Sequence, residues 1–182
     1  DGNLHWMQLN NLDPDVQYRY HFLCDGNLEI GDPYGTLVLD PWEDQYISAS
    51  TYPDMPSYPT GQAYWQQTVF QTVEPEFGWT DQNFQRPPSD RLIIYETLVR
   101  DFDETQTFQD IIDRLDYLQY MGFNAIELMP VSEFEGNLSW GYNPTYRFAV
   151  DKFYGTKEKL KELVNECHNR GIAVILLIFY MT

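Results

Sequence analysis

The chain has 182 residues, of which 43% are hydrophobic and 16% aromatic, and its formal net charge is −17. This length suits one large domain or one and a half small ones, and the hydrophobic fraction is enough to build a core. The negative charge would repel phosphate backbones and anionic lipid surfaces, so we expect no nucleic-acid partner and no membrane partner.

The first part of the chain, residues 1–72, has the pattern of a β region. Residues 16–22 alternate between apolar and polar side chains, which is typical of a half-buried strand. The Asp25-Gly26 pair predicts a hairpin, and residues 37–39 predict a further short strand. These signals are few for a complete sandwich, so we expect its first strands to lie upstream of Asp1.

Irregular, proline-containing sequence follows. Residues 73–90 are predicted to be a linker because the stretch Arg86-Pro87-Pro88-Ser89-Asp90 closes them. After it the pattern changes. Continuous apolar runs predict three strands buried on both faces, at residues 92–95, 125–129 and 172–179. Two amphipathic helices are predicted between them, with the N-caps and C-terminal glycines Thr107 and Gly122, and Thr156 and Gly171.

Residues 91–182 therefore read as strand, helix, strand, helix, strand. Right-handed crossovers make such a unit a parallel sheet, and ligands of such folds lie at the carboxyl ends of the strands. The connection that follows residues 125–129 extends to Phe148 and is rich in aromatic and acidic side chains. A loop of this length at that edge is often functional.

Two aromatic side chains in that loop, Trp140 and Tyr142, are suited to stacking on a sugar ring; the alternative is that both only pack the loop. Glu133 and Glu135 lie close together in sequence, which rarely gives the spacing that glycoside chemistry needs, so we expect solvated acids.

Arg100 is expected to form a structural ion pair with Asp101 or Glu96. His168 lies in the last turn of a predicted helix, where a cation is favourable.

Cys24 and Cys167 are the two cysteines, and their separation predicts neither a disulfide framework nor a zinc site. The two cysteines therefore do not indicate in which cellular compartment the protein lies.

Several motifs together resemble the α-amylase superfamily of glycoside hydrolases, on its glycogen-branching and isoamylase-like side. The matching stretches are Leu92–Phe102, Tyr117–Pro130, Ser139–Pro144, Tyr154–Thr156 and Cys167–Leu176. The resemblance implies that residues 91–182 are the first β-α-β-α-β portion of a TIM (β/α)8 barrel. A shorter match, Asp32-Pro33-Tyr34 after a tyrosine-rich strand, implies a partial immunoglobulin-like β-sandwich at residues 1–72.

The resemblance also implies a role for the loop. In the family, the tyrosine at the Tyr142 position stacks on the sugar next to the cleaved bond, so Tyr142, Trp140 and Asn143 are the predicted substrate-binding residues. The catalytic carboxylates come from later strands, beyond Thr182, so no catalytic residue is predicted within the chain.

The agreement with the family stops after Leu176. Residues 177–182 replace an aspartate, an asparagine that often binds calcium, and a histidine that contacts sugar. The thioether of Met181 is a poor ligand for calcium, so we expect no metal and no cofactor in this chain, and calcium only in a longer parent protein. The loss of these family residues predicts that the C-terminal sequence, residues 177–182, is altered.

The function predicted from these resemblances is that of an inactive N-terminal fragment of a retaining hydrolase or transglycosidase acting on starch- or glycogen-type α-glucan. The alternative is a non-catalytic protein that binds maltooligosaccharide. In either case we expect residues 91–182 to be stabilised by packing against residues 1–90 or by self-association through the open edges of the incomplete barrel.

Overall fold

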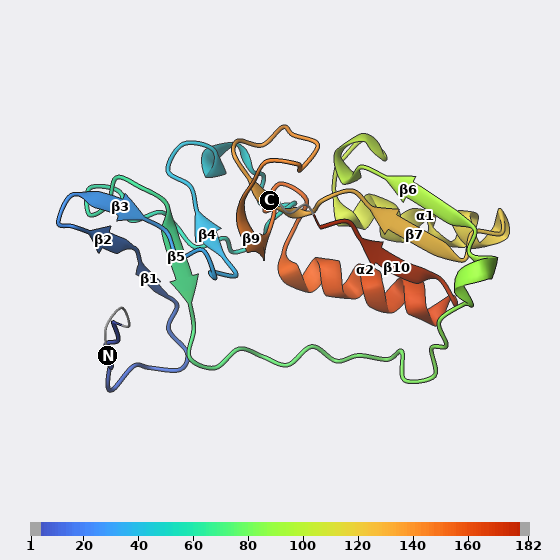
Figure 1. Ribbon diagram of the computed structural model, residues 1–182, viewed down its shortest axis with the longest axis horizontal. Helices are drawn as coiled ribbons and strands as arrows, with labels where there is room; N and C mark the ends of the chain where they lie inside the picture. The colour runs from blue at the N-terminus through green and yellow to red at the C-terminus, as the bar shows by residue number, and fades with distance from the viewer. Residues whose placement is uncertain (1–4, 179–182) are drawn as a thin grey trace.

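The computed structural model describes residues 5–178 (Figure 1). Its N-terminal part contains short strands, at the left of Figure 1, with these bounds: β1 Tyr18–Tyr20, β2 Phe22–Cys24, β3 Leu28–Ile30, β4 Val38–Leu39 and β5 Gln67–Phe70. β1, β5 and β4 form one antiparallel sheet in that order, and β2 and β3 form a hairpin. A 3-10 helix, η1, spans Asp44–Tyr46.

The predicted hairpin at Asp25-Gly26 is confirmed, and both residues have positive φ values of 51° and 75°. The single strand expected at residues 16–22 is wrong, because the strand is interrupted at His21 and the two halves join different sheets. β5 was not predicted, since it lies in the irregular stretch. The region is built of β-strands, but nothing identifies it as immunoglobulin-like, so that assignment stays a prediction.

The C-terminal part, at the right of Figure 1, is a parallel sheet with two helices packed on one face. Its elements are η2 Ser89–Arg91, β6 Ile94–Thr97, η3 Val99–Asp101, α1 Phe108–Tyr120, β7 Ala125–Leu128, α2 Lys157–Asn169 and β10 Ala173–Leu176. The strand order is β10-β7-β6, and both pairs are parallel. The predicted β-α-β-α-β unit is confirmed.

Buried apolar side chains of α1, α2 and β7 form the main core between the helices and the sheet. The helices begin and end where the sequence predicts. Thr107 and Asp110 form a reciprocal capping box at α1, and the Thr156 hydroxyl accepts a hydrogen bond from the Lys159 N–H at 3.0 Å. Gly122 and Gly171 follow the two helices with positive φ, as C-terminal glycines do.

The strand predicted at residues 92–95 is wrong in its bounds and in its burial. β6 begins two residues later, and Ile93 and Ile94 are 55% and 42% exposed. The physical reason is that β6 pairs only with β7, so it is an edge strand of the described sheet. On the face away from the helices, Glu96 lies beside Glu127 in the strand register, and this face is less apolar than expected.

The long connection after β7 is not one irregular loop. Its two ends pair as an antiparallel hairpin of β8 Ser132–Phe134 and β9 Pro144–Val150, which lies between the N-terminal strands and the parallel sheet (Figure 1). The irregular part is therefore limited to residues 135–143.

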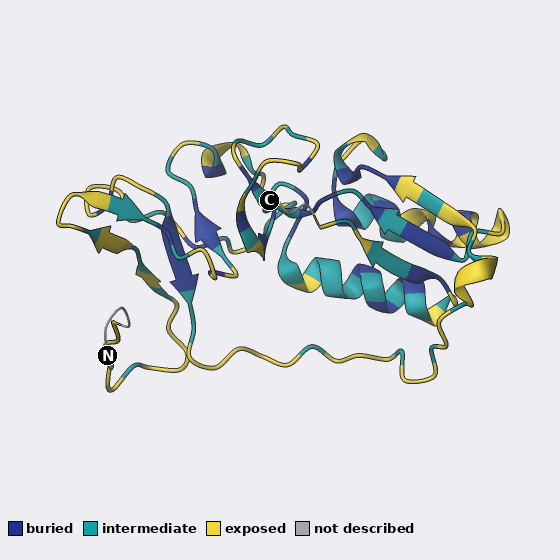
Figure 2. Ribbon diagram, viewed as in Figure 1, coloured by how far each residue is buried: buried dark blue, intermediate teal, exposed yellow. Residues whose placement is uncertain are grey.

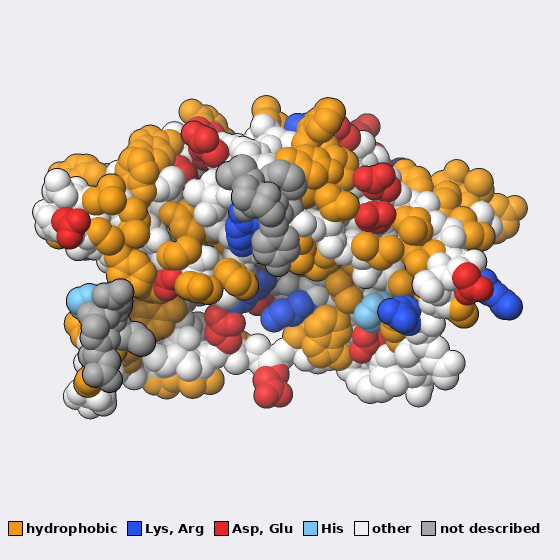
Figure 3. Space-filling model, viewed as in Figure 1, with side chains coloured by type: hydrophobic (Ala, Val, Ile, Leu, Met, Phe, Trp, Pro, Cys, Tyr) orange, Lys and Arg blue, Asp and Glu red, His pale blue; other side chains and the backbone are white. Residues whose placement is uncertain are grey.

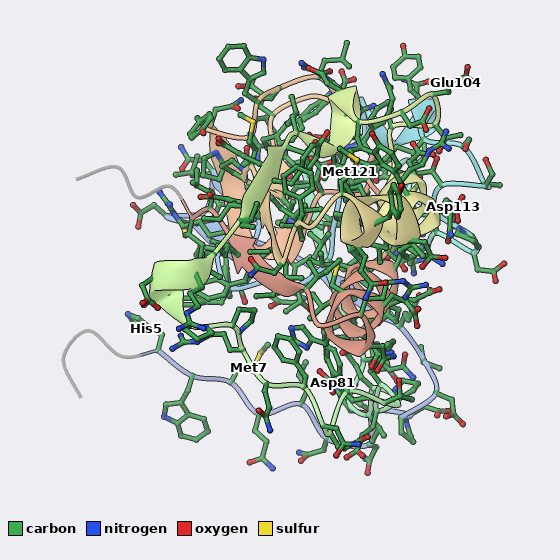
Figure 4. All side chains as sticks on the ribbon, turned by 90° about the vertical axis from the view of Figure 1, so that its right-hand side faces the viewer. His5, Met7, Asp81, Glu104, Asp113 and Met121 are labelled. Carbon is green, nitrogen blue, oxygen red and sulfur yellow. The ribbon has the colours of Figure 1, made fainter. Side chains whose placement is uncertain are left out.

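Residues 73–90 form a largely exposed, irregular segment that runs past α2 to the parallel sheet (Figure 2). Asp81, labelled in Figure 4, pairs with His168 at 2.6 Å, and the His168 ring stacks on Phe84 with 3.9 Å between ring centroids. Asn165 exchanges hydrogen bonds with Thr80 at 2.8 and 2.9 Å. The segment is therefore tied to α2 along its middle.

Neither helix of residues 5–178 is long and apolar enough to cross a membrane. Cys24 and Cys167 are both free, and burial raises the pKa of the Cys167 thiol to about 12. A thiol with so high a pKa is inert at neutral pH.

Candidate functional site

The loop of residues 135–143 is anchored at the carboxyl end of β7 by a glycine. Gly141 has φ of +84°, and its backbone lies so close to Pro130 that a Cβ atom would collide with the Pro130 carbonyl oxygen. Pro130 comes two residues after β7 ends. Only glycine meets both requirements, so it fixes the neighbouring side chains at the edge of the sheet where ligands of parallel α/β folds bind.

The three predicted substrate-binding residues flank this glycine. Trp140 and Tyr142 are 63% and 36% exposed, so neither is core packing alone. The side-chain amide oxygen of Asn143 accepts a hydrogen bond from the Ser139 hydroxyl, which in turn accepts one from the Gly141 N–H at 3.0 Å. The structure thus brings the three residues together, and their role in binding substrate stays a prediction.

Arg100 braces this loop from the neighbouring strand. It lies in η3, just after β6, and forms a two-point ion pair with Asp101 at 2.7 and 3.0 Å. Its remaining nitrogen lies 3.4 Å from the Ser139 carbonyl oxygen. The hydrogen bond to Arg100 lowers the pKa of Asp101, which keeps that carboxylate ionised. The expected ion pair with Asp101 is confirmed, and the contact with Ser139 positions the aromatic loop.

A buried charge cluster lies on the other side of the hairpin. The ammonium of Lys152 is 1% exposed and pairs with Glu133 and, at 3.3 Å, with Asp44 of η1. The backbone N–H of Lys152 also donates to Glu133 at 3.2 Å. The expectation that Glu133 is a solvated acid is wrong, because the hairpin folds it beneath the N-terminal part; Glu135 is exposed as expected.

The electrostatics of the cluster follow from one ammonium shared among several carboxyls. Burial alone would lower the pKa of Lys152, but the charges of Glu133 and Asp44 raise it. Burial and the negative charge of Glu133 raise the pKa of Asp151 well above its usual range. Lys152 therefore stays charged, and it joins the N-terminal part to the hairpin.

This cluster gave no signal in the sequence. Lys152 follows a strand with no helical or alternating pattern, and Asp44 lies far from it along the chain. Only the folded chain brings the charges together. Among residues 5–178 no group of three or more histidine, cysteine, aspartate or glutamate side chains is arranged to hold a metal ion. Met181, which stands where the family has an asparagine and is expected not to bind calcium, lies outside the described residues.

Comparison with known proteins agrees with this geometry. A family model described as the α-amylase catalytic domain matches residues 95–179. A malto-oligosyltrehalose trehalohydrolase of Saccharolobus solfataricus is 34% identical over 162 residues, which is 89% of this chain and 25% of the relative. A 1,4-α-glucan branching enzyme, GlgB, of Shewanella frigidimarina is 29% identical over 91% of this chain and 21% of its own length. The chain thus spans about a quarter of these relatives.

Solved structures give the same fold. A putative α-amylase from Salmonella typhimurium superposes with a TM-score of 0.66 at 23% identity, over 87% of this chain and 23% of that one. The Group B Streptococcus pullulanase SAP, solved in complex with maltotetraose, superposes with a TM-score of 0.57 at 26% identity, over 83% of this chain and 23% of that one. Residues 95–179 of this chain therefore belong to the α-amylase family of catalytic domains.

Proposed function

We propose that this chain supplies one wall of an α-glucan site in a retaining hydrolase or transglycosidase that acts on starch- or glycogen-type polysaccharide. The observation that carries the proposal is the position of Trp140 and Tyr142, which Gly141 and Pro130 hold at the carboxyl end of β7. The pullulanase SAP, which shares this fold, was solved with maltotetraose. We propose an α-glucan ligand for this chain because its fold is similar to that of this pullulanase.

The same proposal holds that the chain alone does not turn over glucan. A retaining glycosidase needs two carboxyl groups about 5 Å apart, one as nucleophile and one as acid and base. Asp101 is engaged by Arg100, and Glu133 is buried against Lys152. Neither of them is free to attack a sugar. We further propose the division into a β module of residues 1–72, a linker of residues 73–90 and a barrel segment of residues 91–182.

The test measures binding and turnover on the same preparation. Maltoheptaose binding by isothermal titration should weaken about tenfold on Tyr142→Ala, the loss expected for one stacked aromatic contact. Tyr120→Ala is the matched control, because Tyr120 is 87% exposed at the end of α1, away from the loop. Equal affinity in the two variants would contradict the assigned role of Tyr142.

Turnover is assayed on starch, glycogen and pullulan by release of reducing ends. We expect no product above a mock preparation. Product that persists through purification and disappears on substitution of a carboxylate of this chain would show that the chain carries catalysis itself, and the proposal would be wrong.

A further inference from the structure

A second groove, distinct from the Trp140–Tyr142 loop, lies between the N-terminal strands and the β8–β9 hairpin. It encloses about 730 Å³, within the range of small-molecule sites. Trp42, Trp65 and Gln66 line one side, and Glu135, Thr145 and Tyr146 line the other. We call it the tryptophan groove. Its two sides come from segments that the fold holds together through the buried Lys152 cluster.

The two tryptophans present a large aromatic surface to solvent. Trp42 and Trp65 are 45% and 44% exposed, although their rings touch with 5.3 Å between centroids. Indole rings usually contribute to a core, so a paired and half-exposed set indicates a surface kept for a ligand. The ring planes differ by 80°.

The aromatic pair is fixed by hydrogen bonds before any ligand arrives. One Asp40 oxygen accepts the backbone N–H groups of Trp42 and Glu43 at 2.7 and 3.0 Å, and the other accepts from Gln66 at 3.1 Å. The Trp65 carbonyl accepts from the Tyr58 hydroxyl at 2.7 Å. Such preorganisation reduces the entropy that binding costs.

The charges of the groove disfavour an anionic ligand. None of the described residues that line it is lysine or arginine, so phosphate and other anions are repelled. Of its four carboxylates, Glu133 is compensated by Lys152, and Asp40 by its three N–H donors. Glu43 and Glu135 remain as hydrogen-bond acceptors at the rim, where sugar hydroxyls are suitable donors.

We propose that the tryptophan groove is a second α-glucan-binding site, separate from the site proposed at the Trp140–Tyr142 loop. Sugar rings stack on indole through their C–H faces, while their hydroxyls reach the rim carboxylates. Because the two indole planes differ by 80°, successive rings that follow them must turn along the chain. An α-linked glucan turns in this way, whereas a β-1,4-linked chain is a nearly flat ribbon.

The experiment labels the full 182-residue chain with 5-fluorotryptophan and follows each of its five tryptophans by fluorine NMR. The signals are assigned by replacing each tryptophan with phenylalanine. On titration with maltoheptaose, the Trp42 and Trp65 signals should shift and saturate, while Trp6 and Trp79 stay unchanged as internal controls. Cellohexaose at the same concentrations should leave all signals in place.

Variants then separate the groove from the loop. Trp65→Ala should weaken the binding seen at Trp42 about tenfold, the equivalent of one stacked aromatic contact, and Tyr142→Ala should leave it unchanged. Trp65→Phe serves where Trp65→Ala fails to fold, and it should weaken binding less. Circular dichroism and a melting curve check each variant.

Two results would overturn the proposal that the tryptophan groove binds α-glucan. If maltoheptaose shifts only the Trp140 signal, or no tryptophan signal, the groove does not bind glucan. If pentalysine shifts the Trp42 and Trp65 signals and maltoheptaose does not, the groove binds cationic peptides instead. The Trp140 signal reports on the function proposed for the loop independently, so either site can fail while the other holds.

Discussion

At the scale of single residues, Gly141 determines where the aromatic loop lies. Gly141→Ala adds the cost of a left-handed backbone, about 1–2 kcal/mol, to a collision with the Pro130 carbonyl. Gly136→Ala is the matched control in the same loop, since Gly136 has φ of +75° but open space around it. We expect Gly141→Ala to lower the melting temperature more than Gly136→Ala, and to weaken maltoheptaose binding at Trp140. Equal losses would show that the contact with Pro130 is unimportant.

Lys152 is the second residue whose substitution should strongly lower the free energy of unfolding. Lys152→Met leaves Glu133 and Asp44 buried without their cation, which costs about 3–5 kcal/mol. Lys157→Met is the control, because Lys157 and its partner Glu74 are 25% and 47% exposed and such a pair contributes about 1 kcal/mol or less. Urea unfolding at pH 7 measures both. A loss at position 152 no larger than at position 157 would contradict the buried pairing.

The same lysine sets an alkaline limit to stability. Its pKa is raised in the folded protein by Glu133 and Asp44, against the lowering effect of burial. The charge therefore stabilises the fold fully below the unfolded pKa of about 10.4, and this contribution is lost as the pH rises through the higher folded value. We expect the wild-type melting temperature to fall above about pH 10 and the fall to be smaller in Lys152→Met. Parallel curves for the two proteins would exclude this origin.

At the scale of elements, the contact between α2 and the segment of residues 73–90 is testable. Asn165 is buried and exchanges hydrogen bonds with both the N–H and the hydroxyl of Thr80. Asn165→Ala leaves the Thr80 N–H without its protein partner, while the hydroxyl keeps its bond from Asn169, so we expect a cost of about 1 kcal/mol. Amide hydrogen exchange should rise around Thr80 while α1 stays protected. Asn169→Ala, which removes one exposed bond to the same hydroxyl, should change exchange little; a similar rise in both would contradict the role of Asn165.

The elements also show which parts of the fold the sequence could predict. α1 and α2 were predicted closely because their caps and their helical spacing are local signals. The hairpin of β8 and β9 was missed because its strands are nine residues apart, Phe134 to Pro144, and its pairing contains bulges that hide the alternation. β5 was missed because its partner β1 lies far away in sequence. The burial of Glu133 likewise depends on Asp44 and Lys152, which no local pattern joins to it.

At the scale of the whole molecule, the open edges of the parallel sheet predict self-association. β6 and β10 are the outer strands of the described sheet. Ile94 in β6 is 42% exposed, and Ile178, two residues after β10, is 59% exposed. Figure 3 shows further hydrophobic side chains at both ends of the molecule. Exposed strand edges of this kind pair with other copies. We expect light scattering to give a mass that rises with protein concentration.

Ile94→Lys should shift that mass toward the monomer, since a charge on an edge strand opposes pairing. Val73→Lys is the control, because Val73 is 61% exposed but lies outside the sheet. A constant monomer mass in the wild-type protein over the whole concentration range would contradict self-association.

The cluster around Lys152 has a consequence for the order in which the protein is made. The N-terminal part leaves the ribosome first, and its contacts with the hairpin are remote, such as the Asn137 amide on the Glu43 carbonyl, 94 residues away. Until residue 152 has emerged, Asp44 has no cation to pair with and must stay hydrated. Asp44 therefore reaches its buried, paired environment only after the hairpin and its lysine have been synthesised.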